Sequence, residues 1–165
     1  MKHLNKNQSK ADRTLVVVDL ENLCGGSGRV AGFYLEARRA IEEVVGSRAV
    51  NYVIASGPRA RGDTPSLPFF WPEARWLVGR GIDGADIALV DVLIEEPFAK
   101  SSQRVVVVSG DHRFAEVLHY LASIGVSTTV ISTASALSHQ CRLAAHHVVT
   151  IPDFVTQTSV PQEAA

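Results

Sequence analysis

The sequence predicts an α/β domain whose central sheet is mostly parallel and covered by helices on both faces. Two observations lead to this prediction. Short β-branched runs such as TLVVV and VVVV are apolar throughout, which is typical of strands buried on both faces. These runs alternate with longer segments of helical period, and this alternation indicates repeated strand-helix-strand units. A single Rossmann-like domain in three layers is therefore expected.

Six segments are predicted as strands because β-branched and other apolar residues dominate them. Taken in chain order, they are residues 14–19, 49–56, 74–78, 104–109, 126–131 and 147–151. Since helical segments separate most of them, consecutive strands are expected to run in parallel.

Four segments between these strands have helical patterns. They are residues 33–45, 86–95, 112–124 and 137–145. The first is amphipathic and is expected to cover the sheet with its apolar side. The second is apolar on most sides, so it should be well buried, and Pro97 prevents its simple continuation. The third ends before Gly125, a residue that favours helix termination.

Composition indicates one domain, because 165 residues with 46% hydrophobic content are enough for a sizeable core. Residues 1–12 and 155–165 are expected to be disordered tails around a domain at 13–154. A net charge of -1 gives no overall attraction to nucleic acid. The two cysteines, the lack of a secretory signal and the lack of a long apolar run favour a cytoplasmic protein without membrane association.

Aspartates stand where predicted strands end and where the most apolar helix begins. Asp19 and Asp111 each follow a strand, and the segment GIDGADIALVD contributes Asp83, Asp86 and Asp91. The carboxyl ends of parallel strands meet at one sheet edge, where open α/β sheets bind their ligands. Carboxylates gathered there repel one another unless a proton or a hard cation joins them. Mg²⁺ or Mn²⁺ is the expected cofactor, and phosphoryl chemistry the expected activity.

Helix geometry indicates which of these acids can bind the same metal ion. Asp86 and Asp91 are five residues apart, about 140° around a helix axis, so both cannot point at one ion. Asp86 is therefore placed with Asp19 and Asp111, while Asp91 ranks lower. Asp83 is expected to be a helix N-cap, with metal ligation as the alternative. An aspartate after a strand also commonly caps the next helix, and Asp111 fits that role as well.

A proline-rich loop after the second predicted strand mixes cations with aromatic residues. It contains Arg59 and Arg61, followed by the FFW run at 69–71 and Trp76. This mixture suits phosphate contact and base stacking on a single strand of nucleic acid. The alternative is that these aromatic residues cap the hydrophobic core.

Three motifs, TLVVVDLENL, GADIALVDVL and VVVVSGDHRF, resemble in this order the NYN branch of the PIN-like nuclease superfamily, bacterial type. The resemblance spans residues 14–151 and implies a metal-dependent ribonuclease. Carried over by position, it implies catalytic and metal-binding roles for Asp19, Asp86 and Asp111. Asn22 matches the asparagine of the first motif, where its amide would orient water or phosphate. The stretch SALSHQCRLAAHHV resembles the end of bacterial NYN domains.

One position departs from the family pattern. Arg113 stands where the Ser-Gly-Asp-x-Asp-Phe signature has its second aspartate. Three interpretations follow: Asp83 or Asp91 compensates, the site holds one metal, or the site is inactive. Arg113 is also a candidate to grip phosphate. Further substrate-binding candidates are Ser109, His112, Arg80, Arg59 and Arg61.

The expected function is that of a Mg²⁺- or Mn²⁺-dependent ribonuclease that hydrolyses phosphodiester bonds of single-stranded or structured RNA. The alternative is a catalytically weak or inactive PIN-like module that binds RNA or a protein. The resemblance also allows a homodimer, and a toxin-like nuclease would have an antitoxin-like protein partner.

Overall fold

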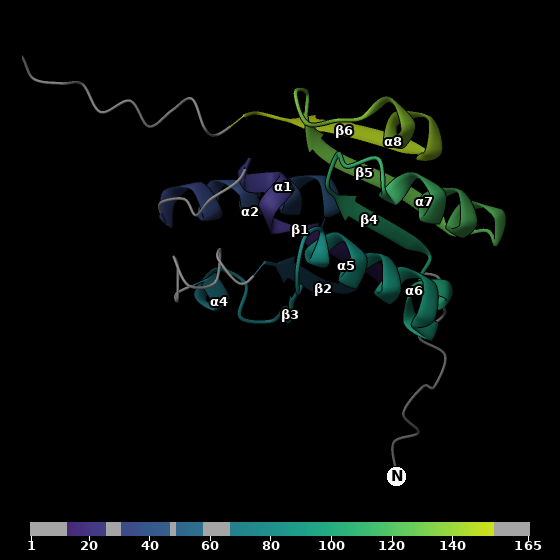
Figure 1. Cartoon of the computed structure of the whole chain (residues 1–165), viewed down its shortest axis with the longest axis horizontal. Coiled ribbons are helices and arrows are strands. Elements are labelled where there is room, and N and C mark those ends of the chain that lie inside the picture. Colours follow the sequence, from purple (N-terminus) through teal and green to yellow (C-terminus); the bar gives the residue numbers. More distant parts are fainter. Residues whose placement is uncertain (1–12, 26–30, 47–48, 58–66, 154–165) are drawn as a thin grey trace, which may run out of the picture.

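The computed structural model describes residues 13–25, 31–46, 49–57 and 67–153. In this part of the chain six parallel strands form one sheet in the order β3-β2-β1-β4-β5-β6 (Figure 1). The strands are β1 (Arg13–Asp19), β2 (Ala49–Ser56), β3 (Arg75–Val78), β4 (Arg104–Val108), β5 (Ser127–Thr133) and β6 (His147–Ile151). The predicted α/β class and all six predicted strands are confirmed, with small shifts at some strand ends.

The strand order reverses between β1 and β4. From β1 the chain proceeds outward through β2 and β3, and then returns to place β4 on the other side of β1. Val17 in β1 consequently pairs with Val53 of β2 and Val107 of β4. In an open α/β sheet this reversal opens a crevice beyond the carboxyl ends of the two strands. Asp19 is the last residue of β1 and so lies at that point.

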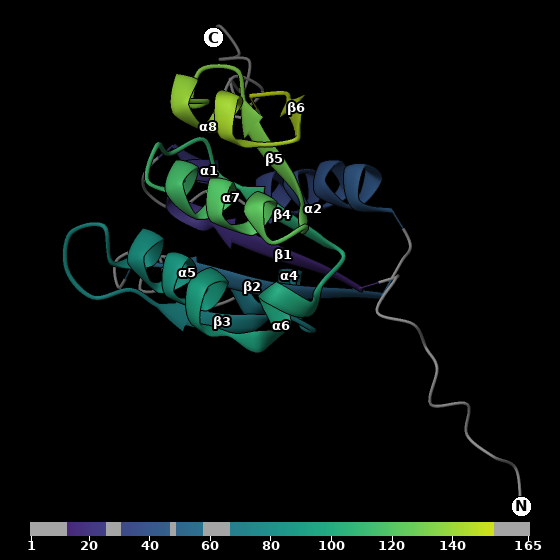
Figure 2. The same cartoon turned by 90° about the vertical axis from the view of Figure 1, so that its right-hand side faces the viewer.

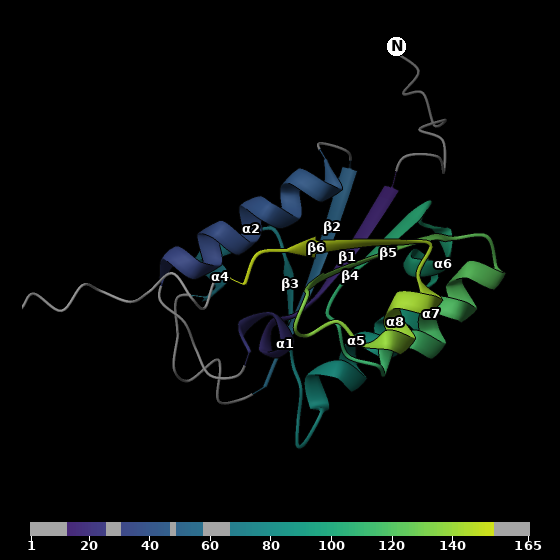
Figure 3. The ribbon, with the colours of Figure 1, turned by 90° about the horizontal axis from the view of Figure 1, so that it is seen from above.

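Helices cover both faces of the sheet, which confirms the three-layer prediction (Figures 2 and 3). One face carries α1 (Leu20–Cys24), α2 (Ala31–Val45) and α4 (Leu67–Phe70). The other carries α5 (Gly84–Glu95), α6 (Pro97–Ser101), α7 (Phe114–Ser123) and α8 (His139–Ala144).

Side-chain alternation along each strand supplies two hydrophobic cores. In β1, Val16 and Val18 pack under α2, whereas Leu15 and Val17 pack under α5 and α7. All four are at most 2% exposed. Burial on both faces explains why this strand is apolar throughout rather than alternating with polar residues.

The helix predictions differ from the structure in two informative ways. The segment after β1, for which no helix was predicted, begins with the five-residue helix α1, which Gly25 ends with a left-handed φ of 64°. Helix α5 was expected to be well buried, but Ile87 is 55% exposed and Ile94 is 39% exposed. An outer-layer helix buries only the side facing the sheet, here through Leu89 and Leu93, whatever its composition.

The aromatic residues of the proline-rich segment after β2 mostly pack into the core. Trp71 is fully buried, and Phe70 stacks on Tyr34 with ring centroids 5.2 Å apart. Trp76 is half-buried beside them, whereas Phe69 is 83% exposed. The core-capping interpretation is therefore correct for three of the four. Both loop arginines that were proposed to bind substrate, Arg59 and Arg61, lie outside the described residues.

Within the described ranges, no helix has both the length and the apolar character needed to cross a bilayer.

Candidate carboxylate site

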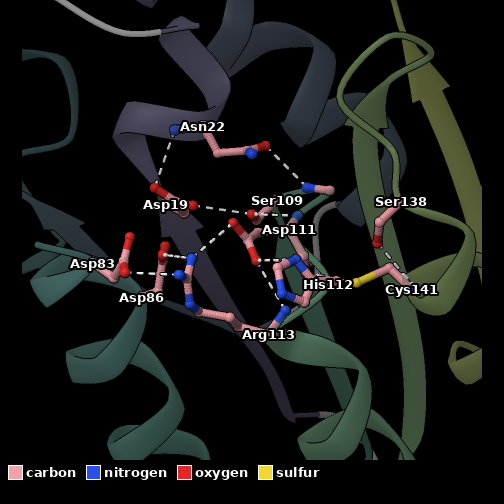
Figure 4. A network of polar contacts seen from close by, with 11 residues as sticks. Asp19, Asn22, Asp83, Asp86, Ser109, Asp111, His112, Arg113, Ser138 and Cys141 are labelled. Carbon is pink, nitrogen blue, oxygen red and sulfur yellow. Dashed lines mark hydrogen bonds and ion pairs between the residues drawn. The ribbon is translucent and has the colours of Figure 1, made fainter.

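Four aspartates gather at the crevice between β1 and β4 (Figure 4). Asp19 ends β1, and Asp111 follows β4 after a two-residue turn. Asp83 and Asp86 come from the start of α5, which follows β3 after a short connection. Sequence reasoning predicted that Asp19, Asp86 and Asp111 would meet at the carboxyl edge of the sheet. The structure brings these three together and adds Asp83.

Asp19 is the most buried member of the cluster, at 2% exposure. Its Oδ1 accepts a hydrogen bond from the backbone N–H of Asn22 at 3.1 Å and thereby caps α1. Its Oδ2 accepts one from the hydroxyl of Ser109 at 3.0 Å. Both donors favour the charged carboxylate, but burial and a neighbouring acid oppose them.

That neighbouring acid is Asp86, which is 8% exposed. Burial and the adjacent Asp86 raise the pKa of Asp19 to about 7. Burial also raises the pKa of Asp86. Burial makes it costly for both carboxyl groups to ionise at once, and a shared proton or a bound cation would relieve that cost. Asp19 and Asp86 are called the inner pair below.

The turn between β4 and Asp111 is held from two sides. Ser109 is 2% exposed, and its Oγ accepts from the backbone N–H of Asp111 at 3.2 Å while donating to Asp19. The side-chain Oδ1 of Asn22 accepts from the backbone N–H of Gly110 at 2.9 Å. Ser109 was predicted to contact substrate. In the structure its hydroxyl is buried and links Asp19 to the turn that presents Asp111, and this agrees with the expectation that Ser109 shapes this turn.

Helix α8 and its N-cap residue also hold this turn, through two hydrogen bonds to its carbonyl groups. The backbone N–H of Ser138 donates to the carbonyl of Gly110 at 2.9 Å. The Sγ of Cys141 donates to the carbonyl of Asp111 at 2.9 Å. Burial raises the pKa of the Cys141 thiol, so it keeps the proton that it donates. Sequence reasoning missed Cys141 as a supporting residue, since no local signal connects positions 30 residues apart.

Arg113 lies among the acids, with its guanidinium inside the cluster (Figure 4). Its Nη2 is 2.7 Å from Oδ2 of Asp83, and its Nη1 is 3.3 Å from Oδ2 of Asp86. The same Nη1 is 3.2 Å from Oδ2 of Asp111. One cation therefore pairs with three carboxylates. The Asp111 side chain is 22% exposed and that of Asp83 is 36% exposed, so these two form the outer, more solvated part of the cluster.

Asp83 stands at the N-cap position of α5, as predicted, but does not cap the helix with its side chain. Its backbone is left-handed, with a φ of 59°, and its carboxylate pairs with Arg113 instead. A non-glycine residue in this conformation is uncommon. The capping interpretation was thus correct for the position and wrong for the side chain.

The remaining candidates stay at the edge of the site or outside it. Asp91 is exposed on α5, and no hydrogen bond or ion pair among the described residues joins it to the cluster. His112 is exposed, with its Nδ1 3.3 Å from Oδ1 of Asp111. Arg80 is exposed in the loop after β3 and is likewise not joined to the four acids in the described structure.

The donor chemistry of the cluster suits Mg²⁺ or Mn²⁺, because Asp19, Asp86 and Asp111 supply only oxygen atoms. However, the described residues contain no preformed group of three or more Asp, Glu, His or Cys side chains with the arrangement of a metal site. Arg113 engages the Oδ2 atoms of Asp86 and Asp111, so its guanidinium lies beside the place that a metal would take. The residues fit a hard cation by type, and a cation there would compete with Arg113 for these two oxygens.

Comparisons with known proteins support the fold. No family model and no curated protein matches the sequence. A solved structure of a protein of unknown function from Vibrio parahaemolyticus RIMD 2210633 is similar, with a TM-score of 0.64 and 18% sequence identity. The match covers 88% of this chain and 96% of that chain. At this identity the likeness shows a shared α/β fold and nothing about activity, so membership of the NYN family stays a prediction.

Proposed function

We propose that this chain is a metal-dependent ribonuclease that hydrolyses RNA phosphodiester bonds at the carboxylate cluster. The observation that carries the proposal is the buried inner pair at the switch point of the sheet. Asp19 and Asp86 are held together although burial raises the pKa of each and the adjacent Asp86 raises that of Asp19 further. Perturbed carboxyl groups in the crevice of an α/β sheet are typical of functional sites.

A divalent cation at this position would neutralise the scissile phosphate and lower the pKa of an attacking water. Asp19, Asp86 and Asp111 are the proposed ligands. Ser109 and the backbone of Asn22 orient the Asp19 carboxylate through the two hydrogen bonds that it accepts. The choice of RNA rests on the three motifs that resemble NYN nucleases, and the oxygen-only donor set agrees with it.

Arg113 is the proposed phosphate-binding residue. A guanidinium offers parallel N–H donors that match two phosphate oxygens. Its side chain is 38% exposed, so it reaches both the acids and the solvent side of the crevice. His112 is exposed beside Asp111 and is the next candidate to contact the RNA backbone.

The second candidate function is an RNA-binding module without catalysis. Its support is the same arginine: Arg113 already balances part of the cluster's charge and replaces the second acid of the NYN signature. In this alternative the acids position Arg113, and RNA binding needs no divalent ion.

Cleavage of end-labelled, mixed-sequence single-stranded RNA separates the two functions. The purified chain is assayed with Mn²⁺, with Mg²⁺ and with EDTA, beside Asp19→Asn, Asp86→Asn and Asp91→Asn. Asp86 and Asp91 lie on the same helix, but only Asp86 joins the cluster, so Asp91→Asn is the matched control. We expect metal-dependent cutting by the wild type and Asp91→Asn, and a loss of at least about 100-fold in the other two.

Wild type and variants that are equally inert, while RNA still shifts on a gel in EDTA, would replace the nuclease by the binding module. Cutting that persists in Asp19→Asn at the wild-type rate would place the activity elsewhere. Circular dichroism of each variant establishes that it is folded.

A further inference from the structure

We infer that Arg113 couples the binding of a divalent cation to the binding of an RNA phosphate. In the free protein Arg113 holds the carboxylates that a cation would use, and a phosphodiester would draw it away from them. The inference rests on the proposed function and assigns Arg113 as a positioning residue that sets when the cluster is ready for metal.

The contacts place Arg113 in direct competition with a cation. Nη1 contacts Oδ2 of both Asp86 and Asp111, which are two of the three proposed ligands. Asp19 contributes no ion pair to Arg113 among the described contacts and is instead held by Asn22 and Ser109. A metal that bound all three acids with Arg113 in place would lie beside a full positive charge. Like charges at such separations repel strongly where solvent is partly excluded.

Arg113 is held by the aspartates weakly enough for a phosphate to replace them as its partner. Its side chain is 38% exposed, and solvent screens its ion pairs with the part-exposed Asp83 and Asp111. A phosphate can accept two parallel guanidinium hydrogen bonds and is therefore a competitive partner. Arg113 lines a groove between α5 and α7 together with Val90, Ile94, Glu116, Val117 and Tyr120. The arginine side chain thus has open space beside the cluster into which it can turn.

The exchange has a thermodynamic signature. If phosphate binding removes Arg113 from the acids, RNA raises the affinity for the cation, and the cation raises the affinity for RNA by the same factor. Removing the charge at position 113 should strengthen metal binding in the absence of RNA and weaken this coupling.

The test is a titration of the full chain with Mn²⁺, in which electron paramagnetic resonance measures free Mn²⁺. It is run with and without a 2′-O-methyl oligoribonucleotide whose integrity is checked on a gel afterwards. The proteins are wild type, Arg113→Gln, Arg113→Lys and Arg39→Gln. Arg39 is exposed on α2, on the opposite face of the sheet, and controls for the loss of one positive charge.

We expect the oligonucleotide to tighten Mn²⁺ binding to wild type and Arg39→Gln by about tenfold or more. Arg113→Gln should bind Mn²⁺ about tenfold more tightly than wild type when no oligonucleotide is present, and the oligonucleotide should then add less. Arg113→Lys keeps the charge and should resemble wild type without oligonucleotide.

Two outcomes separate this inference from the proposed function. Equal Mn²⁺ affinity in wild type and Arg113→Gln, with an equal response to the oligonucleotide, overturns the coupling and leaves the metal site intact. Absence of Mn²⁺ binding in every protein, with and without oligonucleotide, overturns the proposed metal-dependent activity and the coupling with it.

Discussion

The inner pair and the outer acids of the cluster differ in what balances their charge. Asp19 and Asp86 are 2% and 8% exposed, and burial raises the pKa of both. Asp83 and Asp111 are more exposed and pair with Arg113, which also contacts Asp86 but not Asp19 among the described contacts. Exposure therefore separates the acids: the more solvated carboxylates rely on Arg113, whereas burial favours the protonated form of Asp19. Because of this difference, the inner pair is the part of the cluster that we propose to bind the metal.

The largest expected loss of stability comes from a substitution in the turn at Gly110, which joins the inner pair to the outer acids. A Cβ on Gly110 would lie 2.1 Å from the backbone oxygen of Ala136, which has little freedom to move. We expect Gly110→Ala to lower the free energy of unfolding by about 3 kcal/mol or more, as for a severe overpacking change.

Gly57→Ala is the matched comparison, measured in the same urea denaturation series. Its Cβ would meet only the carboxylate end of the flexible Glu21 side chain, with Oε1 at 2.1 Å. Gly57→Ala should lower the free energy of unfolding by about 1 kcal/mol. A similar loss in both variants would contradict the rigid role assigned to the Gly110 turn.

The second largest expected effect is a dependence of stability on pH, which originates in the inner pair. Asp19 ionises near 3.8 when unfolded and near 7 when folded, so the folded state binds more protons between these values. Stability should therefore fall as pH rises from about 4 to about 7 and stay low above that range. An asparagine at position 19 mimics the protonated acid. We expect Asp19→Asn to be more stable than wild type by about 1–3 kcal/mol at pH 8.

Urea denaturation at pH 5 and pH 8 checks this prediction, because the advantage of the variant should shrink at the lower pH. An advantage of equal size at both pH values would mean that Asp19 does not titrate in this range.

The smallest effect is expected in the outer part of the cluster. Asp83→Asn removes one ion pair from Arg113, between side chains that are 36% and 38% exposed. Because solvent screens such a pair, the free energy of unfolding should change by under about 1 kcal/mol. Thermal denaturation in low and high salt would show a difference only at low salt. A larger loss that persists in high salt would show that the outer pairing is structural.

The fold was predictable from the sequence because its signals are local. The apolar β-branched runs give buried parallel strands, and their order along the chain places Asp19 and Asp111 at one edge. Helix geometry also ranked Asp86 above Asp91, and the structure joins only Asp86 to the cluster. These inferences need only the spacing of residues within one element or the common direction of the strands.

The contacts inside the site were less predictable because they join distant parts of the chain. Arg113 meets Asp83 across 30 residues, and nothing in the local sequence of either position indicates the other. Ser109 was assigned to substrate, but its burial against Asp19 depends on how β1 and β4 pair. Helix α1 was missed because a five-residue helix carries almost no periodic signal.

The most direct test of the account is a titration of the aspartate carboxyl carbons by nuclear magnetic resonance from pH 4 to pH 9, with and without Mg²⁺. The account predicts that Asp19 titrates near 7 in the metal-free protein, and that Mg²⁺ lowers this value because a cation favours the charged form. Asp91 should be unaffected by Mg²⁺. An Asp19 carboxyl that titrates near 4 and does not respond to Mg²⁺ would contradict both the inner pair and its role as a metal site.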